Sequence, residues 1–166
     1  SEHEYGVPVP ILMATIRKES GYSARAKPPR TKLLGFIPWK RPSSAYGFSQ
    51  ALDGTWAQYK RETGKYGADR NDFADAVNFV GWYHSKSNRM NGIELNDAYH
   101  LYLAYYFGHT AFSRGDWKTN AGMQQVARST TKMADDYAAQ MRAFVSHGAS
   151  GNSSASDASS GPKTMS

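Results

Sequence analysis

Apolar residues recur at helical spacing along most of this chain. In the first such segment Val9, Leu12, Met13 and Ile16 fall on one face of a helix. We expect this helix to end near Gly21, because glycine tolerates the left-handed conformation that terminates helices.

Three further helices are predicted by a polar residue that precedes an apolar face. Asp53 is expected to cap a helix that Gly64 ends, Asn71 to cap the next helix, and Asn96 to cap a third. The third helix is apolar on most sides, so we expect it to be central and buried. The apolar positions of the three helices are Trp56 and Tyr59, then Phe73, Val77, Val80 and Tyr83, and finally Tyr99, Leu101, Leu103, Tyr105 and Phe107.

A last helix is predicted over about residues 119–145, followed by a change of composition. From residue 146 to 166, Ser, Gly and Ala account for 14 of the 21 residues, which is too little apolar surface for an ordered core. The sequence therefore predicts a mainly α fold with little or no β structure, a domain over residues 1–145 and a flexible tail over 146–166. The stripe of the last helix consists of Met123, Val126, Thr130, Met133, Tyr137, Met141 and Phe144, spaced three or four residues apart.

Charge is concentrated in one segment of the chain. The 166 residues carry a net charge of +6, and residues 25–42 contain six Lys and Arg, no acid and several prolines. We interpret this segment as a basic loop with a short hairpin near residues 33–39. Its charge and its rings permit a nucleic-acid-binding hypothesis, but no nucleic-acid motif is present, so we do not expect a nucleic-acid partner.

Several classes of chemistry are excluded by composition. The chain has no Cys, which excludes disulfides, thiolate zinc sites and a cysteine nucleophile. The five His residues lack metal-ligand spacing, and no phosphate-binding loop is present, so we expect no metal and no cofactor. No apolar run approaches the roughly 20 residues of a membrane span, and no leader pattern opens the chain at Ser1.

Glu19 is the most informative acid. It stands where the first apolar helix is expected to end, beside Ser20 and Gly21. The negative end of a helix and apolar surroundings both favour the protonated carboxyl, which is what a general acid needs. The alternative is an exposed glutamate in a frayed turn, since Arg17 and Lys18 are adjacent.

Three short motifs in order place Glu19 in a family context. The first motif is residues 19–22, Glu-Ser-Gly-Tyr; the second is residues 46–50, Tyr-Gly-Phe-Ser-Gln; the third is residues 104–108, Ala-Tyr-Tyr-Phe-Gly. Over roughly residues 7–117 the chain resembles the soluble lytic transglycosylase (SLT) domain, a helical, goose-type member of the lysozyme-like superfamily. It departs from the family pattern at Ser49, where the family has Met, at Tyr106, where it has Asn, and in a first-to-second motif gap about a dozen residues longer than expected, which the basic loop accounts for.

The resemblance implies a reaction on peptidoglycan. Such enzymes cleave the β-1,4 bond between N-acetylmuramic acid (MurNAc) and N-acetylglucosamine (GlcNAc) and close a 1,6-anhydro ring with a single Glu as acid and base, which corresponds here to Glu19. Ser20 and Gln50 would hydrogen-bond the substrate or the Glu, and Tyr105 would place its hydroxyl near Glu19. Gly47 and Phe48 would form the wall of the groove.

The resemblance also implies a bacterial location and leaves alternatives open. Peptidoglycan lies outside the inner membrane, so the protein would be exported to the cell envelope or periplasm and would act there as a monomer, with an envelope or secretion-complex protein as a further partner class. A non-catalytic domain of the same fold that binds glycan or a partner is one alternative. A muramidase that activates water is another.

Overall fold

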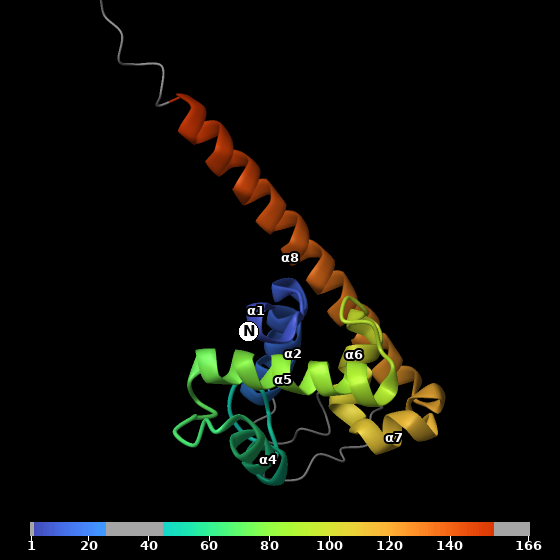
Figure 1. Ribbon diagram of the computed structural model, residues 1–166. Helices are drawn as coiled ribbons and strands as arrows, with labels where there is room; N and C mark the ends of the chain where they lie inside the picture. The colour runs from blue at the N-terminus through green and yellow to red at the C-terminus, as the bar shows by residue number, and fades with distance from the viewer. Residues whose placement is uncertain (1, 26–44, 155–166) are drawn as a thin grey trace, which may run out of the picture.

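The computed structural model describes residues 2–25 and 45–154, and helices dominate both ranges (Figure 1). Within these ranges no strand forms, and Tyr46 and Ala51 make an isolated antiparallel bridge. The prediction of a mainly α fold is therefore confirmed. The elements are α1 (Glu2–Tyr5), α2 (Val9–Arg25), α4 (Asp53–Thr63), α5 (Phe73–Asn91), α6 (Ala98–Phe107), α7 (His109–Arg114), the 3₁₀ helix η1 (Asp116–Thr119) and α8 (Ala121–Ser154).

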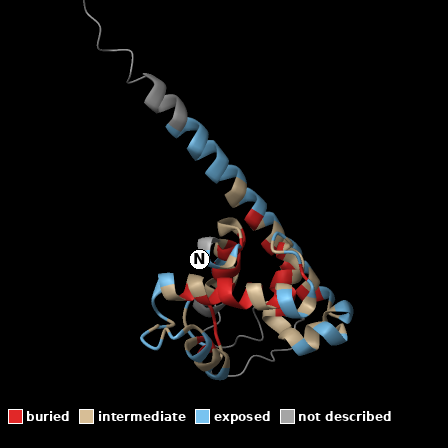
Figure 2. Cartoon of the chain, viewed as in Figure 1, coloured by how far each residue is buried: buried red, intermediate tan, exposed pale blue. Residues whose placement is uncertain are grey.

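The core forms where α5 crosses α2 and α6 (Figures 1 and 2). Rings from α4 and α5 interlock there, and the Tyr59 ring lies 5.4 Å from Phe79 and 5.3 Å from Trp82, centroid to centroid. Helix α6 is the most enclosed, because Leu101 and Leu103 have no exposed surface although they point in different directions around it. The prediction that this helix is central and buried is confirmed.

Several predicted helix ends are wrong by one turn or less. Helix α2 continues past Gly21 to Arg25. The caps of α5 and α6 are Asp72 and Asp97, not Asn71 and Asn96. Each Asp side chain accepts a hydrogen bond from the backbone N–H three residues later, which satisfies an otherwise unpaired donor.

For α4, the predicted N-terminal cap is wrong and the predicted C-terminal end is correct. Asp53 is the first residue of the helix rather than its cap, and the cap position belongs to Leu52. Gly64 does end α4, with φ of 73° and its N–H bonded to the Lys60 carbonyl.

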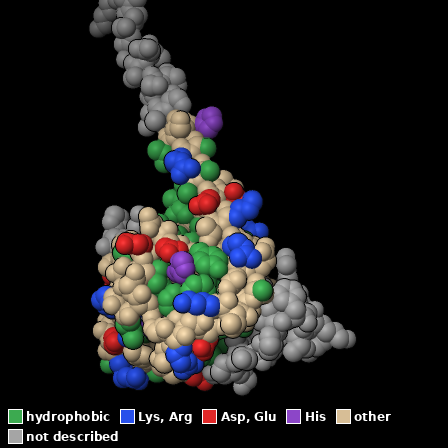
Figure 3. Space-filling view, turned by 90° about the vertical axis from the view of Figure 1, so that its right-hand side faces the viewer, with side chains coloured by type: hydrophobic (Ala, Val, Ile, Leu, Met, Phe, Trp, Pro, Cys, Tyr) green, Lys and Arg blue, Asp and Glu red, His purple; other side chains and the backbone are tan. Residues whose placement is uncertain are grey.

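Helix α8 packs on the body with its first half and projects from it with its second (Figures 1 and 2). Met123 and Thr130 of its stripe are buried, and Lys18 Nζ of α2 donates to Ser129 Oγ at 2.7 Å. Hydrophobic side chains continue along α8 beyond the body (Figure 3), and Phe144 is 79% exposed. The helix ends at Ser154, so the predicted end near residue 145 is wrong, whereas the division into domain and tail stays a prediction.

The basic loop predicted over residues 25–42 lies almost wholly outside the described residues, as does its hairpin near residues 33–39. Among the residues that are described, no helix is long and apolar enough to cross a membrane.

Candidate functional site

The second motif forms a tight turn that its own backbone closes. Tyr46 N–H donates to the Ala51 carbonyl at 3.3 Å, and Gln50 N–H donates to the Gly47 carbonyl at 3.3 Å. The turn requires positive φ at two residues, 80° at Gly47 and 54° at Gln50. Gln50 therefore takes a conformation that is uncommon for a residue with a side chain, and its Nε2 donates to the Gly47 carbonyl at 2.9 Å.

Arg70 holds this turn from the outside. Its carbonyl accepts from Phe48 N–H at 3.3 Å, and its Nη1 donates to the Ala51 carbonyl at 3.0 Å. The same Nη1 lies 2.7 Å from Asp53 Oδ1, which ties the turn to the start of α4. A Cβ atom at Gly47 would lie 2.2 Å from the Arg70 carbonyl oxygen, so only glycine fits at this position.

Tyr105 joins the third motif to the second. Its hydroxyl donates to the Ser49 carbonyl at 2.6 Å, across 56 residues of chain. Its ring is also packed edge-on against Tyr83, with centroids 5.0 Å apart. The two motifs are thus one structural unit, and the placement of the Tyr105 hydroxyl near Glu19 stays a prediction.

Glu19 lies on α2 and is 1% exposed. The predicted alternative, an exposed glutamate in a frayed turn, is therefore wrong. The helix-end argument is wrong as well, because α2 continues to Arg25 and dipole effects are confined to the last turn. Glu19 is buried in the structure, and its role as a general acid stays a prediction.

The orientation of α2 follows from Thr15, which is four residues before Glu19 and so lies on the same face. Thr15 Oγ1 lies 3.0 Å from His84 Nε2 of α5, and the His84 ring lies edge-on to Tyr105 with centroids 5.6 Å apart. The face of α2 that carries Glu19 is therefore turned toward α5 and α6. Ser20, by contrast, uses its hydroxyl within the helix, where it donates to the Ile16 carbonyl at 2.7 Å.

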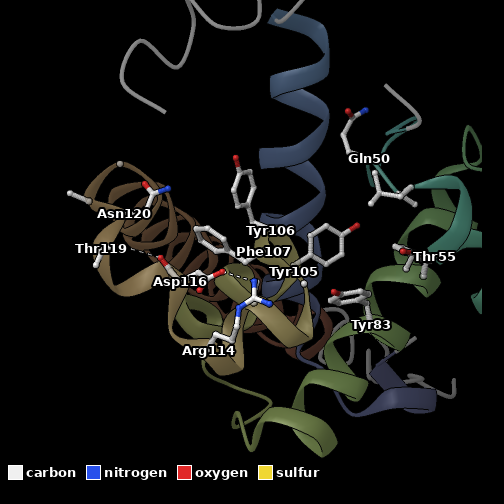
Figure 4. Close-up of a pocket in the computed structure, with 17 residues that line it drawn as sticks. Gln50, Thr55, Tyr83, Tyr105, Tyr106, Phe107, Arg114, Asp116, Thr119 and Asn120 are labelled. Atoms are coloured by element: carbon white, nitrogen blue, oxygen red, sulfur yellow. Dashed lines mark hydrogen bonds and ion pairs between the residues drawn. The ribbon is translucent and has the colours of Figure 1, made fainter. Parts of the chain in front are cut away.

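A cavity of about 1010 Å³ opens beside the second and third motifs (Figure 4). Gln50 and Tyr105 line it, and their predicted role in substrate binding stays a prediction. Glu19, Ser20, Gly47 and Phe48 are not among the described residues that line it, and their predicted roles stay predictions. Its lining comprises Gln50, Ala51, Leu52, Thr55, Phe79, Tyr83, Tyr105, Tyr106, Phe107, Gly108, Ala111, Arg114, Asp116, Thr119, Asn120, Ala121 and Gly122.

Phe48 instead presents a partly exposed ring outside the cavity. It is 37% exposed and packs edge-on against Phe73 of α5, with centroids 5.6 Å apart. The ring is therefore held in place by a neighbour and is still accessible from solvent.

Sequence reasoning missed part of the lining. Tyr83 was expected only as a core residue, and Arg114, Asp116 and Asn120 were not singled out at all. These last three lie on or beside the short elements α7 and η1 and carry no motif, so no sequence signal marked them.

The buried His84 and the partly buried His109 lie against aromatic residues of the cavity lining, His84 against Tyr105 and His109 against Tyr83. Burial lowers the pKa of His84 to about 3, and the nearby His109 adds to this. Burial also lowers the pKa of His109, whose ring stacks on Tyr83 at a centroid distance of 4.3 Å. Both histidines are therefore neutral near pH 7. Among the described residues, no group of three or more potential metal ligands occurs.

Comparison with known proteins gives one family. Residues 1–143 match the family model described as transglycosylase SLT domain. No curated protein and no solved structure matches the chain.

Proposed function

Because the chain belongs to the transglycosylase SLT domain family, we propose that it is a lytic transglycosylase of bacterial peptidoglycan. Its substrate would be the MurNAc-β-1,4-GlcNAc bond, and Glu19 would be the single acid and base. The protein would act without a cofactor, as an exported monomer in the cell envelope or periplasm.

The proposed reaction needs one carboxyl and no water. Glu19 donates its proton to the glycosidic oxygen while the bond from this oxygen to C1 of MurNAc breaks. The resulting carboxylate then accepts the proton of the C6 hydroxyl, and O6 bonds to C1 to close the 1,6-anhydro ring. The proton count returns to its starting value, so Glu19 is regenerated without a second carboxylate, unlike in the usual two-carboxylate glycosidase.

One observation carries the proposal: the second and third motifs are bonded to each other, and His84 links the third motif to the helix that carries Glu19. The α2 face with Glu19 packs toward His84, the His84 ring contacts Tyr105, and Tyr105 bonds to the second-motif turn. Glu19 supplies a buried carboxyl on this helix, and a carboxyl is the kind of group that a general acid requires.

The other predicted site residues would bind the glycan or support the shape of the site. Gln50 and Tyr105 line the cavity and would hydrogen-bond the glycan. Phe48 would offer a ring to a sugar face beside the cavity, and Gly47 would shape the wall by permitting the turn. Ser20 would act through the helix, because its hydroxyl is engaged with the Ile16 carbonyl.

The burial of Glu19 sets a condition on this proposal. A carboxyl that is 1% exposed must become accessible to the glycosidic oxygen when the glycan binds. The side chains around it must therefore move on substrate binding.

Substitution Glu19→Gln tests the assignment, because it keeps the shape of the side chain and removes the transferable proton. We expect the release of anhydro-muropeptides from purified sacculi to fall by about 10²–10⁴-fold, the range typical of general acid–base catalysis. Glu94→Gln is the matched control, since Glu94 is exposed and lies outside the cavity lining. Digestion by Glu19→Gln at the wild-type rate would refute the role of Glu19.

A second candidate is a glycan-binding domain of the same fold that does not cleave. The burial of Glu19 and the presence of Tyr106 in the third motif favour it. Wild-type protein that binds sacculi and releases nothing would support this candidate. A muramidase is the remaining candidate. Mass spectrometry of the released muropeptides distinguishes it from a lytic transglycosylase, because anhydro products are lighter than hydrolysed products by one water.

A further inference from the structure

The charged residues of the cavity lining gather on one side of Tyr105. Gln50 and Thr55 lie on the other side of this ring, whereas Arg114 and Asp116 lie together with the uncharged Thr119 and Asn120 (Figure 4). Of the 17 lining residues in the described part of the chain only Arg114 and Asp116 are charged, so the charge that this lining offers to a bound molecule is on one side of Tyr105.

The two charged residues are held by a tight connection between short helices. Helix α7 ends at Arg114, Gly115 takes the left-handed conformation with φ of 81°, and η1 begins at Asp116. Arg114 Nη2 donates to Asp116 Oδ2 at 2.8 Å. This turn places both charged residues in the lining of the cavity.

The pair is available to a ligand. The side chains of Arg114 and Asp116 are 63% and 43% exposed, and exposed ion pairs contribute little to stability. A guanidinium has five N–H donors, and the bond to Asp116 occupies an Nη2 donor, so the other donors of the planar group can meet a carboxylate.

The glycan backbone does not explain this charge. Its N-acetyl and hydroxyl groups are neutral and are suited to the amide, hydroxyls and rings on the other side of Tyr105. The volume of about 1010 Å³ lies at the top of the usual range for ligand pockets, which leaves room for a substituent beside the sugar rings.

We propose that the Arg114–Asp116 side of the cavity is a subsite for the peptide stem of the glycan, a proposal that rests on the function proposed above. A carboxylate of the stem would accept hydrogen bonds from the Arg114 guanidinium, and a peptide N–H would donate to the Asp116 carboxylate. The protein would thereby prefer glycan that carries peptides over glycan stripped of them.

The test compares two soluble glycan preparations, one with peptide stems and one treated with an amidase that removes them. Wild type is expected to bind and cleave the first more efficiently. Arg114→Gln should lower kcat/KM on peptide-bearing strands by about 3–10-fold, mostly through KM, and should change stripped strands less than twofold. The difference in kcat/KM between wild type and Arg114→Gln on peptide-bearing strands should be smaller at 0.5 M salt, because salt screens exposed charges.

The control is Arg128→Gln, an exposed arginine of α8 that bonds to Gln125 and does not line the cavity. This substitution should leave kcat/KM on both glycan preparations unchanged. Asp116→Asn should also weaken binding of peptide-bearing strands only, because it removes the charge and keeps the shape. Equal unfolding midpoints for all variants would show that the fold is intact.

Two results would overturn the proposal. Equal losses on both preparations would mean that Arg114 recognises the lactyl carboxylate that remains after stripping, or supports the fold. No loss on either would mean that the pair touches no substrate. If wild type releases no product at all, the proposed function fails; titration calorimetry with the same two preparations still decides the subsite, because Arg114→Gln either weakens binding of peptide-bearing strands or does not.

Discussion

Substitution Gly47→Ala tests whether Arg70 fixes the turn of the second motif. A Cβ atom there would lie 2.2 Å from the carbonyl oxygen and 2.7 Å from the carbonyl carbon of Arg70. Both are backbone atoms, so no change of rotamer relieves the clash. Either the turn or the segment around Arg70 has to move.

Gly64→Ala is a matched control, because Gly64 has φ of 73° and nothing lies within 4 Å of its added Cβ. The left-handed conformation costs about 1–2 kcal/mol for alanine. The reduced freedom of the unfolded chain offsets roughly 0.4–1 kcal/mol of this. We therefore expect Gly64→Ala to lower the free energy of unfolding by about 1 kcal/mol.

Gly47→Ala carries the same conformational cost and a further one. Moving the turn away from Arg70 breaks the bond from Phe48 N–H to the Arg70 carbonyl and strains the bond from Arg70 Nη1 to the Ala51 carbonyl. Each is worth about 1 kcal/mol, so the total loss should be about 3 kcal/mol.

Urea unfolding of the wild type and the two variants measures the difference. Gly47→Ala should also lower kcat/KM on sacculi, because Gln50 lines the cavity and its amide is bonded to the Gly47 carbonyl. Gly64→Ala should leave kcat/KM unchanged. Equal losses of stability in the two variants would refute the reasoning, since they would show that the turn does not rest on Arg70.

Two further predictions concern the buried histidine and the projecting helix. His84 has a folded-state pKa of about 3, so below pH 6.5 the unfolded chain takes up a proton that the folded protein does not, and stability falls as pH falls from 6.5 toward 3. Between pH 6.5 and 4.5 the wild type should lose about 2–3 kcal/mol more than His84→Gln in urea unfolding at the two pH values, and equal losses would contradict the neutral, buried histidine. A chain truncated after Val145 should unfold within about 0.5 kcal/mol of the full chain, because residues 145–148 are exposed, and a large fall in its thermal midpoint would show that the end of α8 packs on the body.

Periodicity predicted the elements and the buried helix well, because burial of a continuous apolar face is what selects both. The stripe of α8 is the clearest case: Met123 and Thr130 are buried where other helices cover it. The same periodicity continues to Phe144, which is exposed, so spacing alone does not tell where the covering elements end.

The helix ends were harder to predict, because several adjacent residues could act as the cap of the helix. Asn71 and Asp72 are both good caps by composition, and Asp72 is chosen because its carboxylate meets Asp75 N–H at 2.9 Å. Gly21 has no φ in the positive range, since α2 continues through it. A glycine permits a helix end, but it does not impose one.

The site was predictable only as far as the motifs extend. Gln50 and Tyr105 were both singled out from the motifs, and both line one cavity. Arg114 and Asp116 belong to short elements without periodicity, and their place in the cavity lining is set by the packing of α7 and η1 on α6. Such tertiary placement leaves no pattern in a single sequence.

The departures at Ser49 and Tyr106 affect the lining of the site more than its frame. The hydroxyl of Tyr105 bonds to the backbone carbonyl of Ser49, so the link between the motifs does not depend on which side chain occupies position 49. Ser49 itself is fully buried, where a small side chain fits beneath the turn. Tyr106, in contrast, lines the cavity, where its ring lies edge-on to Phe107 with centroids 5.0 Å apart. The altered third motif thus leaves the bond between Tyr105 and the second motif in place and adds a tyrosine ring to the cavity lining.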